Sequence, residues 1–527
     1  LNLNGCPLDS EQEAVHSCVI YDSDKDTWKV LFFDAYNLEQ TDGEQSYIKT
    51  RILIMAGGAD IDQITEQIVP FWPPPDNADE PRMFCSGHVF LDDGKLIVAG
   101  GHREPVVNNH WARGLKYTYI FDPITETWDY AKNPISGLAQ PMHEGRWYPT
   151  LTKLEDNRVA VVGGFKYNYD RNGNVVYNDT VEVYTPLDGW TQLPPAANTP
   201  SDFIQNKVLY PGAHVIPYDN IYANVKAGHL LYTFPLRQTW RLNPNVNPGN
   251  DYWQPIAMSR HTRGNGSSVI LPLKPNGEMK FVIFGGATGD MEMPETDIEL
   301  LDLSFPTVSD SNPPAWQLHG SMNIPRRNAN CVILPDGKIF ITGGNQMHLR
   351  ENGVTVAEMY NPETGECEIM PSTTFTRMYH STAILLPDAT VMASGGEYIC
   401  SGGIGAGNNN FEIYTPEYLM QGGTRPIILS TGEREVSYTN TLYIDINTSI
   451  NEVILISPGV PTHGFDQHQR AVYADFETLP PNGTHPYLVT MPLNKFIAPT
   501  GWYMLFVIKI INGVKVPSIA KFIRLIE

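Results

Sequence analysis

Short apolar runs that end in a Gly-Gly pair recur along this chain. Six runs carry the pair, and a weaker copy without it fills the longest gap; together they occupy residues 51–58, 95–101, 158–164, 227–232, 281–286, 338–344 and 390–396. Tight polar turns such as Asp92-Asp93-Gly94 precede several runs, and such residues tolerate the left-handed backbone of a hairpin turn. The pattern predicts a β-hairpin unit that is repeated seven times.

The spacing of these units indicates a repeat architecture. Their period is irregular, roughly 45–65 residues, which is close to the ~50 residues of a kelch repeat. Four strands per repeat form a propeller blade, and seven blades closed into a ring leave no long exposed sheet edge. We therefore predict a seven-bladed kelch-type β-propeller over residues 1–424. The alternative is a β-sandwich in which the Gly-Gly pairs coincide by chance.

The pattern changes from residue 425 onward, where Gly-Gly pairs stop. Short strand-like stretches follow at 436–438, 442–444, 453–456, 471–474, 487–490, 502–508 and 519–523. About seven short strands over ~100 residues are typical of an immunoglobulin-like β-sandwich. The predicted fold class is thus all-β, with the propeller followed by this sandwich at residues 425–527.

Composition and charge narrow the range of partners. The 527 residues are 42% hydrophobic, 11% aromatic and 18% charged, which is typical of an ordered globular protein. The formal net charge of −22 argues against nucleic acid and anionic membranes as partners, because both require a basic surface. No apolar run approaches the ~18 residues of a membrane span, so no membrane-spanning segment is predicted.

Six cysteines are present, and no two of them have the C-x-x-C spacing of a zinc site. Cys6 and Cys18 flank a short loop, and we predict a disulfide between them. Cys331, Cys367 and Cys400 are expected to include one further disulfide, with the pair left open. The chain begins at a Leu without an initiator Met, and we interpret it as a processed, exported protein that is secreted, extracellular or in the cell envelope.

Four chemically distinctive side chains occupy the same place relative to the repeated unit. Cys85, Tyr148, Tyr379 and His380 each stand just before an apolar run that ends in Gly-Gly. In a ring of such units these side chains converge near the axis, and His463 adds a second imidazole from the C-terminal part. Two imidazoles, two phenols and a thiol indicate a mononuclear copper site, because imidazole and phenolate suit Cu(II).

The motifs that contain these residues resemble the radical-copper oxidase family, which includes galactose oxidase and glyoxal oxidase. The resemblance lies in four stretches, read as Phe-Cys-Ser-Gly-His at 84–88, Gly-Arg-Trp-Tyr-Pro-Thr at 145–150, Arg-Met-Tyr-His-Ser at 377–381, and Thr-His at 462–463 with Gln-Arg at 469–470. The first two are more similar to the glyoxal oxidase branch. Each motif alone is weak evidence, but all four in order, at matching places in the repeats, are specific and extend over nearly the whole chain.

The resemblance implies a role for each residue. Cys85 would be joined by a thioether to the ring of Tyr148, and the modified Tyr148 would be both a copper ligand and the radical. Tyr379 would be the axial ligand and the base that takes the substrate proton. His380 and His463 would complete the protein ligands of one copper ion.

The function implied is an exported copper-radical oxidase that oxidises small aldehydes or primary alcohols with O2 and releases H2O2. Glyoxal-like aldehydes are favoured by the first two motifs. The alternative hypothesis is a non-catalytic kelch propeller that serves as a binding or structural protein of a cell envelope or matrix, since a fold does not determine a function. All five site residues are present, which favours the enzyme.

One stretch departs from the family pattern. Galactose oxidase places a Trp over the thioether just after a Gly-Gly pair, whereas this chain has Phe165-Lys166-Tyr167 there. The shield over the radical is then Phe165, Tyr167 or a Trp from elsewhere. His88, His102, His110 and His143 are interpreted as structural, and loops at 108–110 and 398–410 are expected to influence substrate choice.

Overall fold

The computed structural model describes most of the chain, and it is built almost entirely of strands. The described residues are 15–33, 38–39, 47–55, 61–69, 83–103, 113–167, 175–206, 208–245, 251–289, 291–347, 351–396, 398–400, 403–405, 410–420, 423–481 and 484–527. Helices in these ranges are short, namely α1 (Ser201–Gln205), α2 (Glu417–Met420), η1 (Pro195–Ala197) and η2 (Ile221–Ala223). None of them is long and apolar enough to cross a membrane. The predicted all-β class is confirmed.

Seven antiparallel sheets follow one another in chain order as far as residue 414. The first three comprise β1 (His16–Asp22), β2 (Thr27–Phe33), β3 (Leu38–Glu39), β4 (Tyr47–Met55) and β5 (Ile61–Val69); β6 (Ser86–Phe90), β7 (Leu96–Gly100), β10 (Thr118–Asp122) and β11 (Thr127–Tyr130); and β12 (Thr150–Lys153), β13 (Val159–Val162), β16 (Glu182–Thr185) and β17 (Gly189–Gln192). A small sheet beside them joins β8 (His102–Arg103), β9 (Arg113–Gly114), β14 (Phe165–Tyr167) and β15 (Val176–Tyr177).

The remaining four sheets repeat the same order of strands. They comprise β18 (Gly212–Val215), β19 (Leu230–Phe234), β20 (Gln238–Leu242) and β21 (Trp253–Met258); β22 (Ser267–Ile270), β23 (Lys280–Phe284), β24 (Asp297–Asp302) and β25 (Trp316–Ser321); β26 (Asn330–Ile333), β27 (Ile339–Thr342), β28 (Val356–Tyr360) and β29 (Cys367–Ser372); and β30 (Ser381–Leu385), β31 (Val391–Gly395) and β34 (Phe411–Tyr414). A two-stranded hairpin, β32 (Tyr398–Cys400) and β33 (Gly403–Gly405), follows β31.

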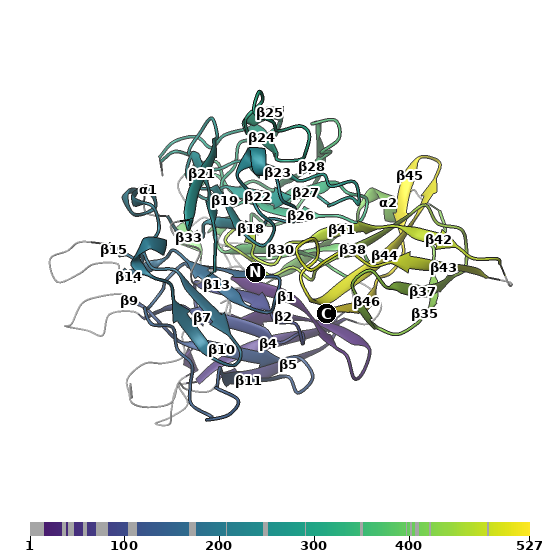
Figure 1. The fold of residues 1–527 in the computed structure, drawn as a ribbon, viewed down its shortest axis with the longest axis horizontal. Coiled ribbons are helices and arrows are strands. Elements are labelled where there is room, and N and C mark those ends of the chain that lie inside the picture. Colours follow the sequence, from purple (N-terminus) through teal and green to yellow (C-terminus); the bar gives the residue numbers. More distant parts are fainter. Residues whose placement is uncertain are drawn as a thin grey trace.

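The first strands of these sheets meet in the middle of the molecule. β6 contacts β12, β12 contacts β18, and the series continues through β22, β26 and β30 to β1. His16 of β1 lies against His88 of β6, with ring centroids 4.9 Å apart, and this contact links the two ends of the series. Figure 1 shows β1, β18 and β30 gathered near the centre with the outer strands around them. This ring is compatible with seven blades, although the blade number stays a prediction because the last sheet has three strands in the described residues.

An ion pair with a buried guanidinium recurs in four sheets, and it explains the Gly-Gly signal. An Arg before the first strand pairs with a Glu on the third strand: Arg146 with Glu182 (3.1 Å), Arg263 with Glu299 (2.7 Å), Arg326 with Glu358 (2.5 Å) and Arg377 with Glu412 (2.9 Å). Each guanidinium also donates to the carbonyl of the first Gly of the pair, at Gly163, Gly285, Gly343 and Gly395. A Cβ on Gly286 would lie 2.8 Å from the Arg263 backbone, so the second position excludes larger residues.

The C-terminal strands form two packed sheets. One contains β35 (Ile428–Thr431), β37 (Thr441–Ile446), β43 (His485–Thr490) and β42 (Phe476–Thr478); the other contains β36 (Glu435–Ser437), β46 (Lys521–Ile526), β44 (Gly501–Ile511), β38 (Glu452–Ile456) and β41 (Ala471–Ala474), with β45 (Val514–Pro517) beside β44. Ile444, Val489 and Leu505 lie in one buried cluster that extends to Phe281 of β23. Burial of these alternating apolar residues holds the C-terminal sheets against the ring.

A hairpin of the C-terminal part enters the ring of first strands. It consists of β39 (Pro461–Thr462) and β40 (Phe465–Asp466), and it contacts β1, β26 and β30. The Gln467 side chain accepts hydrogen bonds from the backbone N–H groups of His88 (3.2 Å) and Leu151 (3.0 Å). Gln469 accepts another from Ile270 at 2.8 Å. These bonds to first strands of three sheets fix the hairpin, and with it His463, on the axis.

The predicted disulfides are wrong. Cys18 is a free, buried thiol on β1, and Cys6 lies outside the described residues. Cys331 and Cys367 are also free thiols, and the side chain of Cys400 lies outside the described residues. Cys18 is held in an apolar cluster whose packing, rather than a covalent bond, explains its burial.

Candidate metal centre

The candidate residues lie where the chain enters a first strand with a left-handed backbone. Cys85 (φ 57°) and His380 (φ 68°) stand immediately before β6 and β30, and Tyr148 (φ 66°) stands two residues before β12. His463 (φ 52°) occupies the turn between β39 and β40. Left-handed backbone is uncommon for residues other than Gly, Asn, Asp and His, and at Cys and Tyr it persists where surrounding structure enforces it.

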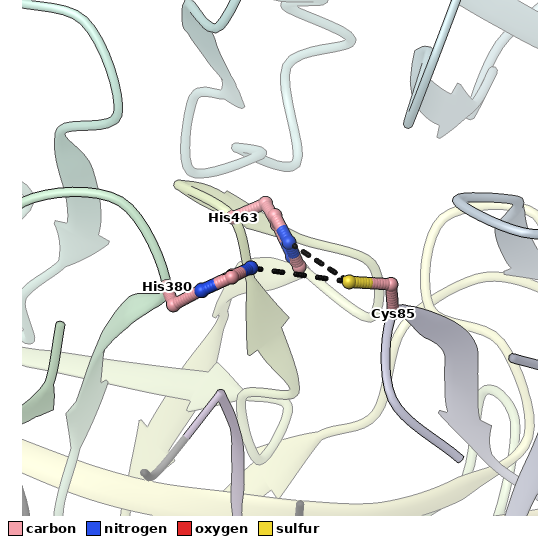
Figure 2. Close-up of side chains that lie close together, drawn as sticks. All are labelled: Cys85, His380 and His463. Atoms are coloured by element: carbon pink, nitrogen blue, oxygen red, sulfur yellow. Dashed lines mark hydrogen bonds between the residues drawn. The ribbon is translucent and has the colours of Figure 1, made fainter. Parts of the chain in front are cut away.

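The thiol and the two imidazoles face one another. The Cys85 Sγ atom lies 3.5 Å from Nε2 of His463 and 3.9 Å from Nε2 of His380. All three donor atoms lie within 4.8 Å of one another, and all three residues are buried. Figure 2 shows the side chains converging from three separate segments of the chain. The expected convergence of these residues is therefore present.

The two phenols complete the cluster. The Tyr379 hydroxyl donates a hydrogen bond of 2.8 Å to the Tyr148 hydroxyl. The His463 ring lies edge-on to both phenol rings, with centroids 5.3 Å from Tyr148 and 5.1 Å from Tyr379. Tyr379 also packs on its neighbour His380 at 3.9 Å. All five predicted side chains thus lie around one point, while their individual roles stay predictions.

Burial sets the protonation of these groups. It raises the pKa of Tyr148 well above its usual value, and the nearby Cys85 and Tyr379 raise it further. Burial also raises the pKa of the Cys85 thiol, while contacts with His380, Tyr148 and Trp147 oppose that rise. Desolvation lowers the pKa of His463, so its imidazole is neutral and able to act as a metal donor.

A hydroxyl fixes the orientation of the His463 ring. Thr462 Oγ1 lies 3.1 Å from the carbonyl of Val15, to which it donates, and 2.7 Å from Nδ1 of His463. Because the hydroxyl proton is used on Val15, the oxygen accepts the N–H of Nδ1. The lone pair of Nε2 then faces Cys85, which is the usual arrangement of a metal-binding His held by a second hydrogen bond.

Trp147 covers the face of Tyr148, and sequence reasoning did not single it out. The two rings are stacked, with centroids 4.9 Å apart and planes at 24°. His102 stacks on Trp147 at 4.6 Å and 14°. Phe165 meets Tyr148 edge-on at 6.2 Å, so it does not cover the ring face, and the side chain of Tyr167 lies outside the described residues. The signal was present in the Trp-Tyr pair of the second motif.

Two further histidines lie behind the cluster. His16 and His88 are fully buried, and none of their ring nitrogens has a hydrogen-bond partner among the described residues. Burial lowers the pKa of His88 to about 3, which keeps its imidazole neutral. His143 is exposed and bonded to Glu182, in keeping with a structural role. His110 and the loop at 108–110 lie outside the described residues, as does most of 401–409.

The donor set fits a copper ion. Imidazole, phenol and thiol groups suit copper, whereas calcium and magnesium prefer oxygen ligands such as carboxylates, carbonyls and water. Only Cys85, His380 and His463 form a group of three or more candidate His, Cys, Asp or Glu donors in the part of the chain that the structure describes. Two phenol oxygens beside this group are unusual for structural zinc, which takes Cys and His in tetrahedral sets.

The fold and the donor set define a class: an all-β ring whose axis carries a buried centre of two imidazoles, two phenols and a thiol. Comparison with known proteins agrees with this class. Residues 77–418 match the family described as glyoxal oxidase N-terminus, and residues 425–525 match the galactose oxidase-like, early set domain. The chain therefore belongs to the glyoxal oxidase family of copper-radical oxidases.

Individual relatives are similar over most of this chain. An aldehyde oxidase of Vitis pseudoreticulata is 28% identical over 472 residues, which is 84% of this chain and 82% of that protein. A galactose oxidase of Gibberella zeae is 27% identical over 84% of this chain, and the match spans 61% of that longer protein. The structure of a fungal alcohol oxidase of the AA5 family, in complex with copper, superposes with a TM-score of 0.74 over 99% of both chains at 22% identity, which supports the fold.

Proposed function

We propose that this protein is an oxidase of small aldehydes or primary alcohols that uses one copper ion and a thioether-linked tyrosyl radical. The single observation that supports it most is the meeting of Cys85, Tyr148, Tyr379, His380 and His463 in one cluster. In the proposed centre, His380 and His463 hold the metal through Nε2, and the two phenol oxygens supply the remaining protein ligands. Copper would accept one electron and the Tyr148 radical the other, so that substrate loses two electrons and O2 becomes H2O2.

Tyr379 is proposed as the base. Its hydroxyl already bonds to the Tyr148 hydroxyl at 2.8 Å, so a proton taken from a substrate hydroxyl arrives in a preformed hydrogen-bond pair. A free phenol titrates near pH ~10, and metal binding lowers that value, which makes the oxygen of Tyr379 a usable base near neutrality. Trp147, stacked on Tyr148, excludes water from one face of the proposed radical.

Aldehydes are proposed as the first substrates to test, because the matched family and the Vitis relative are named for aldehyde oxidation. A panel of glyoxal, a longer aldehyde, galactose and a primary aliphatic alcohol, with detection of H2O2 after copper loading in air, separates the substrate classes. Peroxide from none of them, by a chain that carries the thioether, would contradict the proposed substrates.

The proposal also assigns the site residues to two domains. Residues 1–424 are proposed as the propeller that carries four of the site residues, and residues 425–527 as the sandwich that supplies His463. We further propose that the protein is exported to the extracellular space or the cell envelope. Immunoblotting of culture medium, envelope and cytoplasm of the source cells tests the location, and a purely cytoplasmic signal would contradict it.

The thioether itself is the sharpest test of the oxidase. The linked chain is lighter by two hydrogen atoms than the unlinked one, and a peptide map locates the link because Cys85 no longer reacts with an alkylating reagent. Copper-loaded, oxygen-exposed protein in which Cys85 stays alkylatable would support the alternative of a non-catalytic propeller. Cys18 remains a free thiol and serves as the internal control for alkylation after unfolding.

A further inference from the structure

Tyr210 stands in the fourth sheet where Tyr148 stands in the third. Each is two residues before a first strand, β18 or β12, each is followed by Pro, and each has a left-handed backbone, with φ of 43° and 66°. Tyr210 is only 5% exposed. The ring thus repeats one backbone geometry and places a third tyrosine beside the two predicted ones.

Four contacts join Tyr210 to three separate segments of the site. Its backbone N–H donates to the carbonyl of Tyr148 at 3.1 Å. Its hydroxyl donates to the carbonyl of Ser86, the residue after Cys85, at 2.9 Å. Its ring lies 4.6 Å from that of His463, at 33°, and meets the ring of Tyr148 edge-on at 5.4 Å.

These contacts act on the relative placement of Cys85 and Tyr148. The loops that carry the two residues are linked directly by one backbone hydrogen bond, from the N–H of Tyr148 to the carbonyl of Cys85 at 2.9 Å. Tyr210 provides a second link, because it bonds to one loop through its backbone and to the other through its hydroxyl. Gln467 also bridges the two segments further along, at His88 and Leu151, so the bonds of Tyr210 act on the loop ends that carry Cys85 and Tyr148. The same side chain also packs on the imidazole of His463.

We propose that Tyr210 is a positioning residue that aligns Cys85 with the ring of Tyr148 for thioether formation and holds the plane of the His463 imidazole. The inference rests on the proposed function and deepens it. In the linking reaction the S–H bond of Cys85 and one ring C–H bond of Tyr148 are lost and a C–S bond forms. The two electrons and two protons released reduce dioxygen to H2O2. Tyr210 takes no part in these bonds, since its hydroxyl is engaged by Ser86.

The alternative is that Tyr210 only fills space in the core. A space-filling role depends on ring volume and not on the hydroxyl, so Tyr210→Phe distinguishes it from the proposed positioning role. The matched control is Tyr418→Phe. It removes a similarly buried phenol hydroxyl, which lies away from the site and donates to the Ala389 carbonyl at 2.7 Å. Near-ultraviolet circular dichroism and thermal melting verify that both variants are folded.

The experiment follows thioether formation in time. Copper-free, reduced full-length protein is mixed with copper in air, and the fraction of linked Cys85–Tyr148 peptide is measured by mass spectrometry. Loss of the hydrogen bond from the Tyr210 hydroxyl to Ser86 should slow thioether formation in Tyr210→Phe by about two- to tenfold, the range expected for one net hydrogen bond. Tyr418→Phe should link at the wild-type rate.

A second variant tests the contact with His463. Tyr210→Leu removes the ring, and we expect an altered Cu(II) electron paramagnetic resonance spectrum together with slower linking, while Tyr210→Phe keeps the wild-type spectrum. Wild-type linking rates in both variants would overturn the inference and leave the proposed function standing. Failure of the wild-type protein to form any thioether would instead overturn the proposed function.

Discussion

Replacing Trp147 by Leu should raise the one-electron reduction potential of the Tyr148 radical and shorten its lifetime. The indole covers the phenol face at 4.9 Å with nearly parallel planes, and His102 supports it from behind at 4.6 Å. Oxidation leaves the phenol ring poor in electrons, and an electron-rich neighbour stabilises that form more than the reduced form. Leu offers no such π-system, so the oxidised form loses this support.

The magnitude follows from the strength of a stacked pair. Aromatic pairs contribute about 0.5–1.5 kcal/mol beyond burial of area. If that whole amount favours the oxidised ring, the potential rises by about 20–60 mV, because a tenfold change in equilibrium is 1.4 kcal/mol and 59 mV for one electron. Trp147→Phe keeps a smaller ring in place and should give an intermediate shift.

Redox titration of the linked, copper-loaded protein, followed by the optical absorption of the radical, measures the shift, and decay of the same band measures lifetime. Trp190→Phe is the control, because Trp190 is a buried indole on β17, in the sheet whose first strand follows Trp147, and its N–H bonds to Thr118 away from the site. An unchanged potential and lifetime in Trp147→Leu would refute the reasoning that stacking on Trp147 tunes the radical.

Three further outcomes are expected. Glu299→Leu should lower the free energy of unfolding by about 3–5 kcal/mol, because it leaves the buried guanidinium of Arg263 without its charge partner. Adding Arg263→Met should restore much of the loss. Urea denaturation measures both changes, and equal stability of the wild type and the two variants would contradict this prediction. Burial raises the pKa of Asp466 to about 6, so the stability contributed by its protonation is full below the unfolded pKa near ~4 and is lost as pH rises through 6. The melting temperature of Asp466→Asn should therefore lack this decline between pH 4 and 8. A variant with the same pH dependence of melting temperature as the wild type would refute the assignment of the decline to Asp466. Copper at 100 times its Kd should raise the free energy of unfolding by about 2.7 kcal/mol, and His380→Ala, which removes a proposed ligand, should abolish most of the accompanying rise in melting temperature.

The convergence of the site was predictable because it depends on a repeat. Each first strand starts at the same place in its unit, so residues just before those strands share one level near the axis once the units form a ring. Cys85, Tyr148 and His380 follow from that rule alone. His463 does not follow from that rule, because its placement depends on the hairpin that Gln467 and Gln469 fasten to first strands, and side-chain bonds of this kind leave no periodic pattern.

The stacked Trp147 was hidden for a different reason. Neighbouring residues of an extended strand point to opposite faces, so a Trp beside Tyr148 is expected to point away from it. The left-handed φ of 66° at Tyr148 breaks that alternation and allows the adjacent rings to stack. The disulfide predictions failed for a related reason, since spacing along the chain places Cys331 and Cys367 in one sheet but says nothing of the two strands that separate β26 from β29.

The left-handed positions before the first strands connect fold and chemistry. In the part of the chain that the structure describes, six of them are occupied by residues other than Gly, in chain order Cys85, Tyr148, Tyr210, Asn265, Asn328 and His380. Asn tolerates this backbone at little cost, so the two Asn positions require no functional explanation. His is also enriched there, whereas Cys and Tyr are not, and strain of about 1–3 kcal/mol at Cys85, Tyr148 and Tyr210 is retained where surrounding structure enforces it. By this criterion Tyr210 groups with the predicted site residues Cys85 and Tyr148 and not with the two Asn, which is an independent reason to give it a role at the site.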